Sequence, residues 1–121
     1  MAFSTINKST DYMNTVLYTG NGGTQSITGV GFQPDFTWLK KRNATANNNV
    51  FDAVRGSDKR LITNDTGVEV TQSNFITSFN SDGFSIGDDA VINSNTNTFA
   101  SWNWKANGAG SANTDGTINS T

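Results

Sequence analysis

The chain contains no cysteine and no histidine among its 121 residues. The absence of cysteine excludes a disulfide framework and a zinc–thiolate site. The absence of histidine removes the usual general base, the most common metal ligand and every Ser-His-Asp arrangement. We therefore predict that the protein is not an enzyme, and we expect no catalytic residue, no cofactor and no metal site.

Charged residues are scarce as well, at 15% of the chain, and the net charge is −2. Lys40, Lys41 and Arg42 form the only basic cluster, and a short cluster of this kind is typical of a solvated strand end. Nucleic-acid binding requires a broader basic face, so we expect no nucleic-acid partner.

Long hydrophobic segments are also missing. No apolar run approaches 18 residues, and we expect no membrane insertion. The first residues lack the basic and apolar segments of a secretory signal, and we predict none.

The carboxylates allow two further hypotheses. Asp82, Asp88 and Asp89 lie close in sequence and offer oxygen ligands of the kind that calcium takes, but their spacing matches no EF-hand loop. Aspartate is common in turns, which is the interpretation that we favour. Asp52 with Asp58, or Asp82 with Asp89, would be the carboxylate pair of a glycosidase, although the sequence shows no apolar pocket that would raise one pKa.

Small polar residues dominate the composition. Asn (17), Thr (17), Ser (12) and Gly (12) together account for 58 of the 121 residues. Asn and Gly favour turns and Thr tolerates strands, while good helix formers are few. A chain of this length is expected to form one domain. The composition predicts short strands joined by polar loops.

The expected strands alternate in hydrophobicity and are bounded by turn residues. They span residues 14–19, 24–30, 35–41, 50–54, 60–63, 68–70, 75–79, 83–87 and 98–105, with a polar loop over 88–97. The glycine-rich spacer 20–23 predicts a hairpin between the first two strands. We expect the first and last strong strands to lie close together. The predicted fold is all-β, a two-sheet antiparallel sandwich of jelly-roll or concanavalin-like type.

The only proline, Pro34, has no N–H to donate, and we expect it to precede the strand 35–41 outside the hydrogen-bond ladder. The outer segments are expected to differ from the sandwich at 14–106. Residues 1–13 are predicted to form an N-terminal arm or edge strand. Residues 107–121, rich in Gly, Ser, Asn and Thr, are predicted to form a flexible linker or tail. We expect both segments to contact neighbouring molecules.

The aromatic residues support two interpretations. Alternation places Trp102 and Trp104 on one face of the last strand together with an alanine, and we predict that both indoles, with Phe84, are core aromatic residues. In the second interpretation the aromatic rings form a platform that stacks on sugar C–H faces, and its members are Trp38, Trp102, Trp104, Tyr12 and Tyr18. Trp38 and Tyr18 are then the predicted glycan contacts.

Several segments, taken in order, resemble a known family. The most specific are Gly31-Phe32-Gln33-Pro34-Asp35 and Trp102-Asn103-Trp104-Lys105. The others span residues 17–22, 27–30, 38–40, 51–56 and 81–84. Together they resemble an uncharacterised β-rich domain that recurs in tail-fibre and other virion structural proteins of tailed phages, especially marine ones.

This resemblance implies a location in the virion and a role as a tail-fibre or appendage module in host attachment. The implied partners are other virion proteins, copies of the chain itself in a homotrimer, and a host surface glycan. The family offers no catalytic residues to transfer. Two alternatives remain open: a capsid decoration (cement) protein, and a free carbohydrate-binding module.

Overall fold

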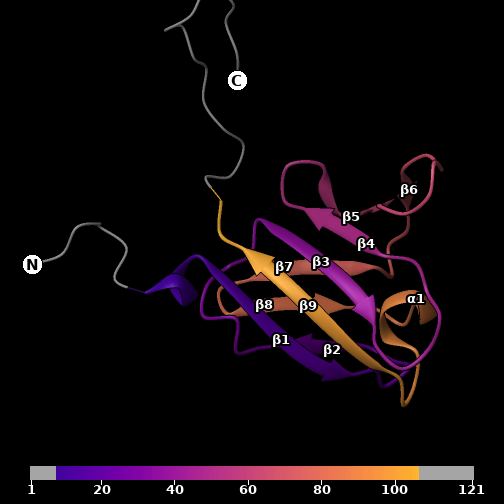
Figure 1. Ribbon diagram of the computed structural model, residues 1–121, viewed down its shortest axis with the longest axis horizontal. Helices are drawn as coiled ribbons and strands as arrows, with labels where there is room; N and C mark the ends of the chain where they lie inside the picture. The colour runs from indigo at the N-terminus through magenta and orange to yellow at the C-terminus, as the bar shows by residue number, and fades with distance from the viewer. Residues whose placement is uncertain (1–7, 107–121) are drawn as a thin grey trace, which may run out of the picture.

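The computed structural model describes residues 8–106, which form two antiparallel sheets packed face to face (Figure 1). The larger sheet has six strands in the order β1 (Met13–Thr19), β9 (Thr98–Trp104), β3 (Phe36–Lys41), β4 (Asn49–Asp52), β5 (Gly56–Ile62) and β6 (Val70–Thr71). The smaller sheet has the order β2 (Gln25–Ile27), β8 (Gly83–Ile86) and β7 (Ile76–Asn80). The two helical elements are the 3-10 turn η1 (Ser9–Asp11) and the helix α1 (Ala90–Asn93).

The predicted all-β sandwich is therefore confirmed. The smaller sheet lies behind the larger one, and α1 lies at one end of the sandwich (Figure 1). Neither helical element of the described chain is long and apolar enough to cross a membrane. The predicted tail at 107–121 and the first seven residues of the predicted arm lie outside the described residues.

The core fills the space between the two sheets. Its fully buried aromatic residues include Phe51, Phe75 and Phe84, so the prediction that Phe84 is a core residue is confirmed. Phe51 and Phe75 meet edge to face with their ring centroids 5.7 Å apart. Aliphatic side chains from both sheets and from α1 complete the cluster: Ile27, Leu39, Ile76, Ile86 and Ile92.

The first and last long strands are direct neighbours. β1 pairs with β9 along its whole length, from Met13 opposite Trp104 to Thr19 opposite Thr98, as expected. The predicted hairpin between the first two strands is wrong, because β1 and β2 belong to different sheets. The spacer crosses between the sheets, where Gly20 packs so closely on the chain after α1 that an added Cβ would lie 2.1 Å from the Ser94 carbonyl oxygen.

The entry to β3 agrees with the prediction for proline. Pro34 precedes the strand and lies outside the ladder, which begins at Phe36. The backbone N–H of Asp35 donates to the Trp104 carbonyl at 2.9 Å, so the chain joins β9 directly after the proline. The proline therefore fixes the strand boundary without removing a ladder hydrogen bond.

The face assignment of β9 is wrong. Phe99, Ser101 and Asn103 point inward and are fully buried, whereas Trp102 and Trp104 point outward and are half-buried.

The polar side chains that point inward from β9 are hydrogen-bonded within the sheet. The Asn103 amide nitrogen donates to the Asn14 carbonyl at 3.2 Å, and its oxygen accepts from the hydroxyl of Thr37 at 3.0 Å. The Ser101 hydroxyl donates to the Val16 carbonyl at 3.1 Å. Because these groups are satisfied, burying them costs little and the larger indoles stay outside.

Candidate functional site

Two cross-strand rows of side chains cover the outer face of the larger sheet. In one row Trp102 lies opposite Thr15 on β1 and opposite Trp38 on β3. In the next row Trp104 lies opposite Met13 and Phe36. Directly opposite residues share a face of the sheet, so the three indoles and Phe36 are brought together by register alone.

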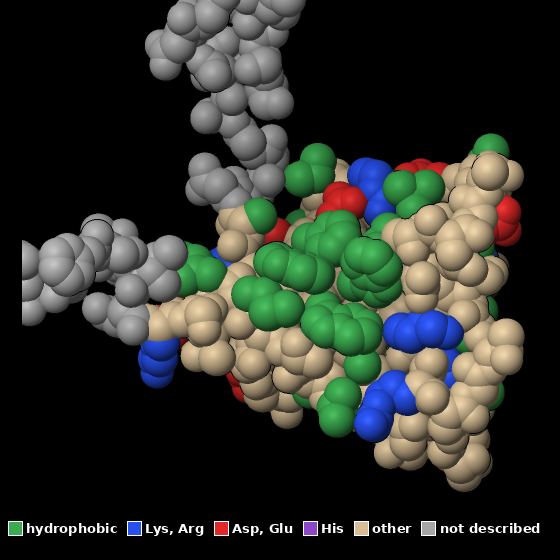
Figure 2. Space-filling model, in the orientation of Figure 1, with side chains coloured by type: hydrophobic (Ala, Val, Ile, Leu, Met, Phe, Trp, Pro, Cys, Tyr) green, Lys and Arg blue, Asp and Glu red, His purple; other side chains and the backbone are tan. Residues whose placement is uncertain are grey.

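The indoles line an open hollow of about 340 Å³. Its lining consists of Trp38, Trp102 and Trp104, with Lys40 and Asn48 at the margin, and we call these five residues the indole surface. Figure 2 shows the hydrophobic side chains gathered in the middle of this face, with positive charge beside them. The chain contains three tryptophans, and all of them belong to the indole surface.

Neighbouring contacts hold the indole surface in place. Phe36 packs edge to face on Trp104, with 5.2 Å between the ring centroids and 62° between the planes. The ammonium group of Lys40 donates to the Ala46 carbonyl at 2.6 Å, which ties the loop after β3 to the margin of the hollow. The Asn48 backbone N–H donates to the Asn64 side chain at 2.9 Å. The hollow is therefore formed by side chains on strands, with a loop fixed at its edge.

Tyr18 lies on the opposite face of the larger sheet from Trp38. Its ring stacks on Phe99 at 5.2 Å between centroids and meets Phe84 edge to face at 6.4 Å. Its hydroxyl donates to the Ile92 carbonyl at 2.8 Å, and burial raises the pKa of Tyr18 well above its usual value. Trp38 and Tyr18, the two predicted glycan contacts, therefore do not lie together. The prediction that Tyr18 belongs to the same site as Trp38 is wrong.

The three aspartates considered above as calcium ligands form hydrogen bonds with, or cap, nearby parts of the chain. Asp82 accepts from the backbone N–H groups of Gly29 at 3.0 Å and Gly31 at 2.7 Å, and these hydrogen bonds lower the pKa of Asp82. Asp88 accepts from the Asn74 amide at 2.9 Å, and Asp89 caps α1. No group of three or more potential metal ligands occurs within residues 8–106. These aspartates serve turns and a helix cap.

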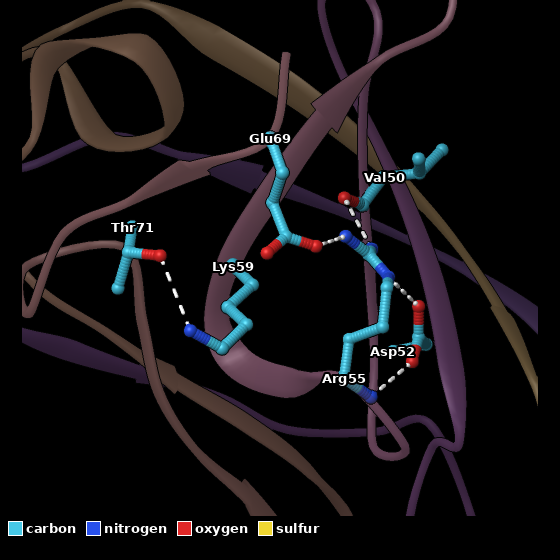
Figure 3. A network of polar contacts seen from close by, with 6 residues as sticks. All are labelled: Val50, Asp52, Arg55, Lys59, Glu69 and Thr71. Carbon is cyan, nitrogen blue, oxygen red and sulfur yellow. Dashed lines mark hydrogen bonds and ion pairs between the residues drawn. The ribbon is translucent and has the colours of Figure 1, made fainter.

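Asp52, one member of the suggested carboxylate pairs, belongs to an ionic network around Arg55 (Figure 3). The Arg55 guanidinium contacts the Asp52 carboxylate and pairs with Glu69 at 2.8 Å, so it joins β4 to the segment before β6. Partial burial acts to raise the pKa of Asp52, but the hydrogen bonds from Arg55 outweigh it and hold this pKa below its usual value. The geometry gives Asp52 a structural role.

Residues 8–121 match the family described as a domain of unknown function, DUF7483. The chain belongs to the DUF7483 family. The match begins just before η1 and includes every strand of both sheets, so the indole surface lies within the DUF7483 region. No curated protein matches the chain, and no solved structure does.

The favoured interpretation of the sequence places Trp102 and Trp104 in the core, whereas the structure places both outward. The alternation of β9 defines two sets of residues but does not say which set faces the core. The signal that could have decided this is the presence of Phe99, a large apolar residue, in the competing set, and the structure buries it fully. Trp38, by contrast, lies where the sugar-platform interpretation expected it, on an open face beside other indoles.

Proposed function

We propose that this DUF7483 domain is a host-attachment module of a phage virion, and that the indole surface is its glycan-binding site. The observation that carries the proposal is the gathering of all three tryptophans on one open sheet face. The resemblance to tail-fibre domains supports the virion location and the attachment role. The glycan is the ligand class that the chemistry of the hollow favours.

Sugar rings present an apolar C–H face and a rim of hydroxyl groups. An aromatic surface with polar groups at its edge matches both features, because the indoles stack on the C–H face while the margin forms hydrogen bonds. Trp38 and Trp102 occupy adjacent strands, and adjacent strands lie about 4.8 Å apart. A sugar ring lying on this face would therefore contact both indoles. Lys40 and Asn48 would then reach its hydroxyl groups.

The second candidate is a capsid decoration protein, for which the same face would bind another virion protein. An exposed apolar patch on a sheet is a common mark of a protein interface. In the described chain β1 is paired on one side only, and its open edge could join a further copy. We favour attachment because the hollow combines neighbouring indoles with hydrogen-bonding groups at its margin.

Tryptophan fluorescence tests the proposal directly, since every tryptophan of the chain lies at the site. We expect host surface polysaccharide to shift or quench the emission in a saturable way. Trp38→Ala and Trp102→Ala should each weaken binding at least about tenfold, the loss expected for one stacking contact of about 1.4 kcal/mol. Leu17→Ser is the matched control, because Leu17 is 57% exposed on an edge strand of the same sheet and lies outside the hollow.

The two candidates give opposite results. If the polysaccharide leaves the emission unchanged, and the two tryptophan variants instead fail to bind particles that lack this protein, the decoration role is correct. A polysaccharide preparation that gains reducing ends during incubation would contradict the prediction that the protein is not an enzyme. Cryo-electron microscopy of the parent particle would test the proposed location in the virion.

A further inference from the structure

A second hollow, of about 290 Å³, lies beside α1. It is lined by two cationic side chains, Lys41 and Arg60, by Asn47, and by the apolar side chains of Ala46, Ala90 and Val91. We propose that this hollow, the cationic hollow, binds an oxyanion: a carboxylate, sulfate or phosphate group carried by a small ligand. The proposal is independent of the indole surface, because no lining residue is shared.

The two cations come from different strands and are placed by the core. Lys41 ends β3 opposite Phe99, and its ammonium lies 5.8 Å from the centroid of that ring. The guanidinium carbon of Arg60 lies 4.9 Å from the ring centroid of Phe75. Aromatic faces attract cations, so both charges are held in position without neutralisation by a carboxylate.

Among the residues that the structure describes, no acidic side chain lines the cationic hollow. Both ion pairs found within residues 8–106 involve Arg55, so neither Lys41 nor Arg60 is paired there. The carboxylates that precede α1 serve other groups, since Asp89 caps the helix and Asp88 accepts from Asn74. The hollow is thus a local positive site on a chain of net charge −2.

Arg60 presents only part of its guanidinium to the hollow. Its Nε atom is buried and has no hydrogen-bond partner in the described part of the chain, and because this atom is closed to solvent, a ligand in the hollow does not reach it. An oxyanion would bind the terminal nitrogens of the guanidinium, which arginine commonly presents to carboxylate and phosphate.

Asn47 and the apolar residues complete the recognition. The amide oxygen of Asn47 accepts from the Asn64 amide at 3.1 Å, which orients the Asn47 amide nitrogen as the remaining donor. Ala46, Ala90 and Val91 would contact the apolar body of a ligand. The expected ligand is therefore a small molecule or sugar residue with one negatively charged oxygen-bearing group.

The test uses the full chain and two-dimensional amide NMR at constant ionic strength. Sulfate, phosphate and glucuronate are titrated, with chloride and neutral glucose as controls. We expect saturable shifts of the Asn47, Ala90 and Val91 amides with the oxyanions and not with the controls. A response to glucuronate but not to the inorganic ions would identify an acidic sugar as the source of the charge, and the reverse would identify a free anion.

Charge-removing variants assign the site. Arg60→Met and Lys41→Met should each weaken binding at least about tenfold. Lys59→Met is the matched control, because it removes the same charge from the adjacent position on β5 and leaves the hollow intact. Arg60→Lys, which keeps the charge but removes the paired guanidinium donors, should give an intermediate affinity. This variant can replace Arg60→Met if Arg60→Met does not fold.

Two results would overturn the proposal. One is an unmodified protein whose amide shifts fail to saturate with all three oxyanions, or are spread evenly over its surface with all three. The other is an affinity in Lys59→Met that falls as far as in Arg60→Met or Arg60→Lys.

Discussion

Trp38 and Trp102 lie directly opposite each other on β3 and β9, and both indoles face outward into the same hollow. Thr37 and Asn103, one position along in the same register, face inward and are hydrogen-bonded to each other at 3.0 Å. This pair of strands therefore buries a polar contact and exposes an aromatic one. An arrangement of this kind gives up core hydrophobic area and leaves an apolar patch on the outer face of the sheet.

Truncating β9 side chains on opposite faces should have unequal effects on stability. Phe99 is fully buried and stacks on Tyr18, so Phe99→Ala should lower the free energy of unfolding by about 3–5 kcal/mol. Trp102 is half-buried, and Trp102→Ala should lower it by only about 1–2 kcal/mol. Urea denaturation of both variants measures this difference. Equal losses would mean that Trp102 acts mainly as a packing residue.

Much of the fold follows from patterns within single strands. The turn residues before Phe36 and after Lys41 bound β3 within one residue of the prediction, and the alternation in β8 places Phe84 in the core. Such local signals suffice when one face of a strand is clearly more apolar than the other. They place elements along the chain but do not pair them, which is why the β1–β2 hairpin was predicted although the two strands lie in different sheets.

Other features depend on partners distant in sequence. Which face of β9 is buried depends on the carbonyls of Asn14 and Val16, which accept from Asn103 and Ser101 more than 80 positions away. β5 begins at Gly56, four residues before its predicted start, where Arg55 links the preceding turn to Glu69. The sequence predicts a loop where α1 lies, because four residues show no helical period and only the Asp89 cap marks the start of the helix. No periodicity in a single sequence reports these contacts.

Asn93 connects α1 to the loop that leaves β1, and replacing it with aspartate should be severely destabilising. It is fully buried, and its amide nitrogen donates to the Asn21 side chain, to the Gly23 carbonyl and to the Gly87 carbonyl. In Asn93→Asp an ionised carboxylate would face these acceptors, so we expect a loss of about 3 kcal/mol or more.

The control for this variant is Asn95→Asp, which makes the same chemical change at an exposed position two residues away. Thermal unfolding of both proteins at neutral pH should separate them clearly. Similar melting temperatures would show that the Asn93 hydrogen bonds contribute little and that the loop is held by its glycines instead.

The network around Arg55 should give the protein a measurable sensitivity to acid. The pKa of Asp52 is lower in the folded state than in the unfolded chain, so its stabilising contribution is present above the ordinary carboxyl pKa of about 3.9. That contribution is lost as the pH falls through the folded-state pKa. Arg55→Met removes the cause of the shift and, because the side chains are partly exposed, should cost about 1 kcal/mol at neutral pH.

Urea denaturation of the native protein and Arg55→Met between pH 7 and pH 2 tests this point. The free energies of unfolding of the two proteins should converge in acid, since protonated Asp52 no longer pairs with Arg55 in the native protein and the variant lacks this pair at every pH. Lys59→Met is the control. Within residues 8–106 the Lys59 side chain bonds only the Thr71 hydroxyl, at 3.2 Å, so this variant should differ from the native protein by an amount that does not depend on pH in this range. A constant gap for Arg55→Met would mean that its role is packing and not charge.

Tyr18 should ionise only when the protein unfolds in alkali. Its pKa is raised by burial, so the folded state holds the phenol proton more strongly than the unfolded chain does. The corresponding stability is complete below the unfolded pKa of about 10 and is lost as the pH rises above it.

Two variants test this point. In Tyr12→Phe, which leaves Tyr18 as the single tyrosine, the tyrosinate absorbance should rise together with the loss of β-sheet circular dichroism. Tyr18→Phe should lose stability less steeply above pH 10, although it gives up the hydrogen bond to the Ile92 carbonyl. Reversible ionisation in Tyr12→Phe with the circular dichroism unchanged would show that the ring is open to solvent, and would restore Tyr18 as a possible glycan contact.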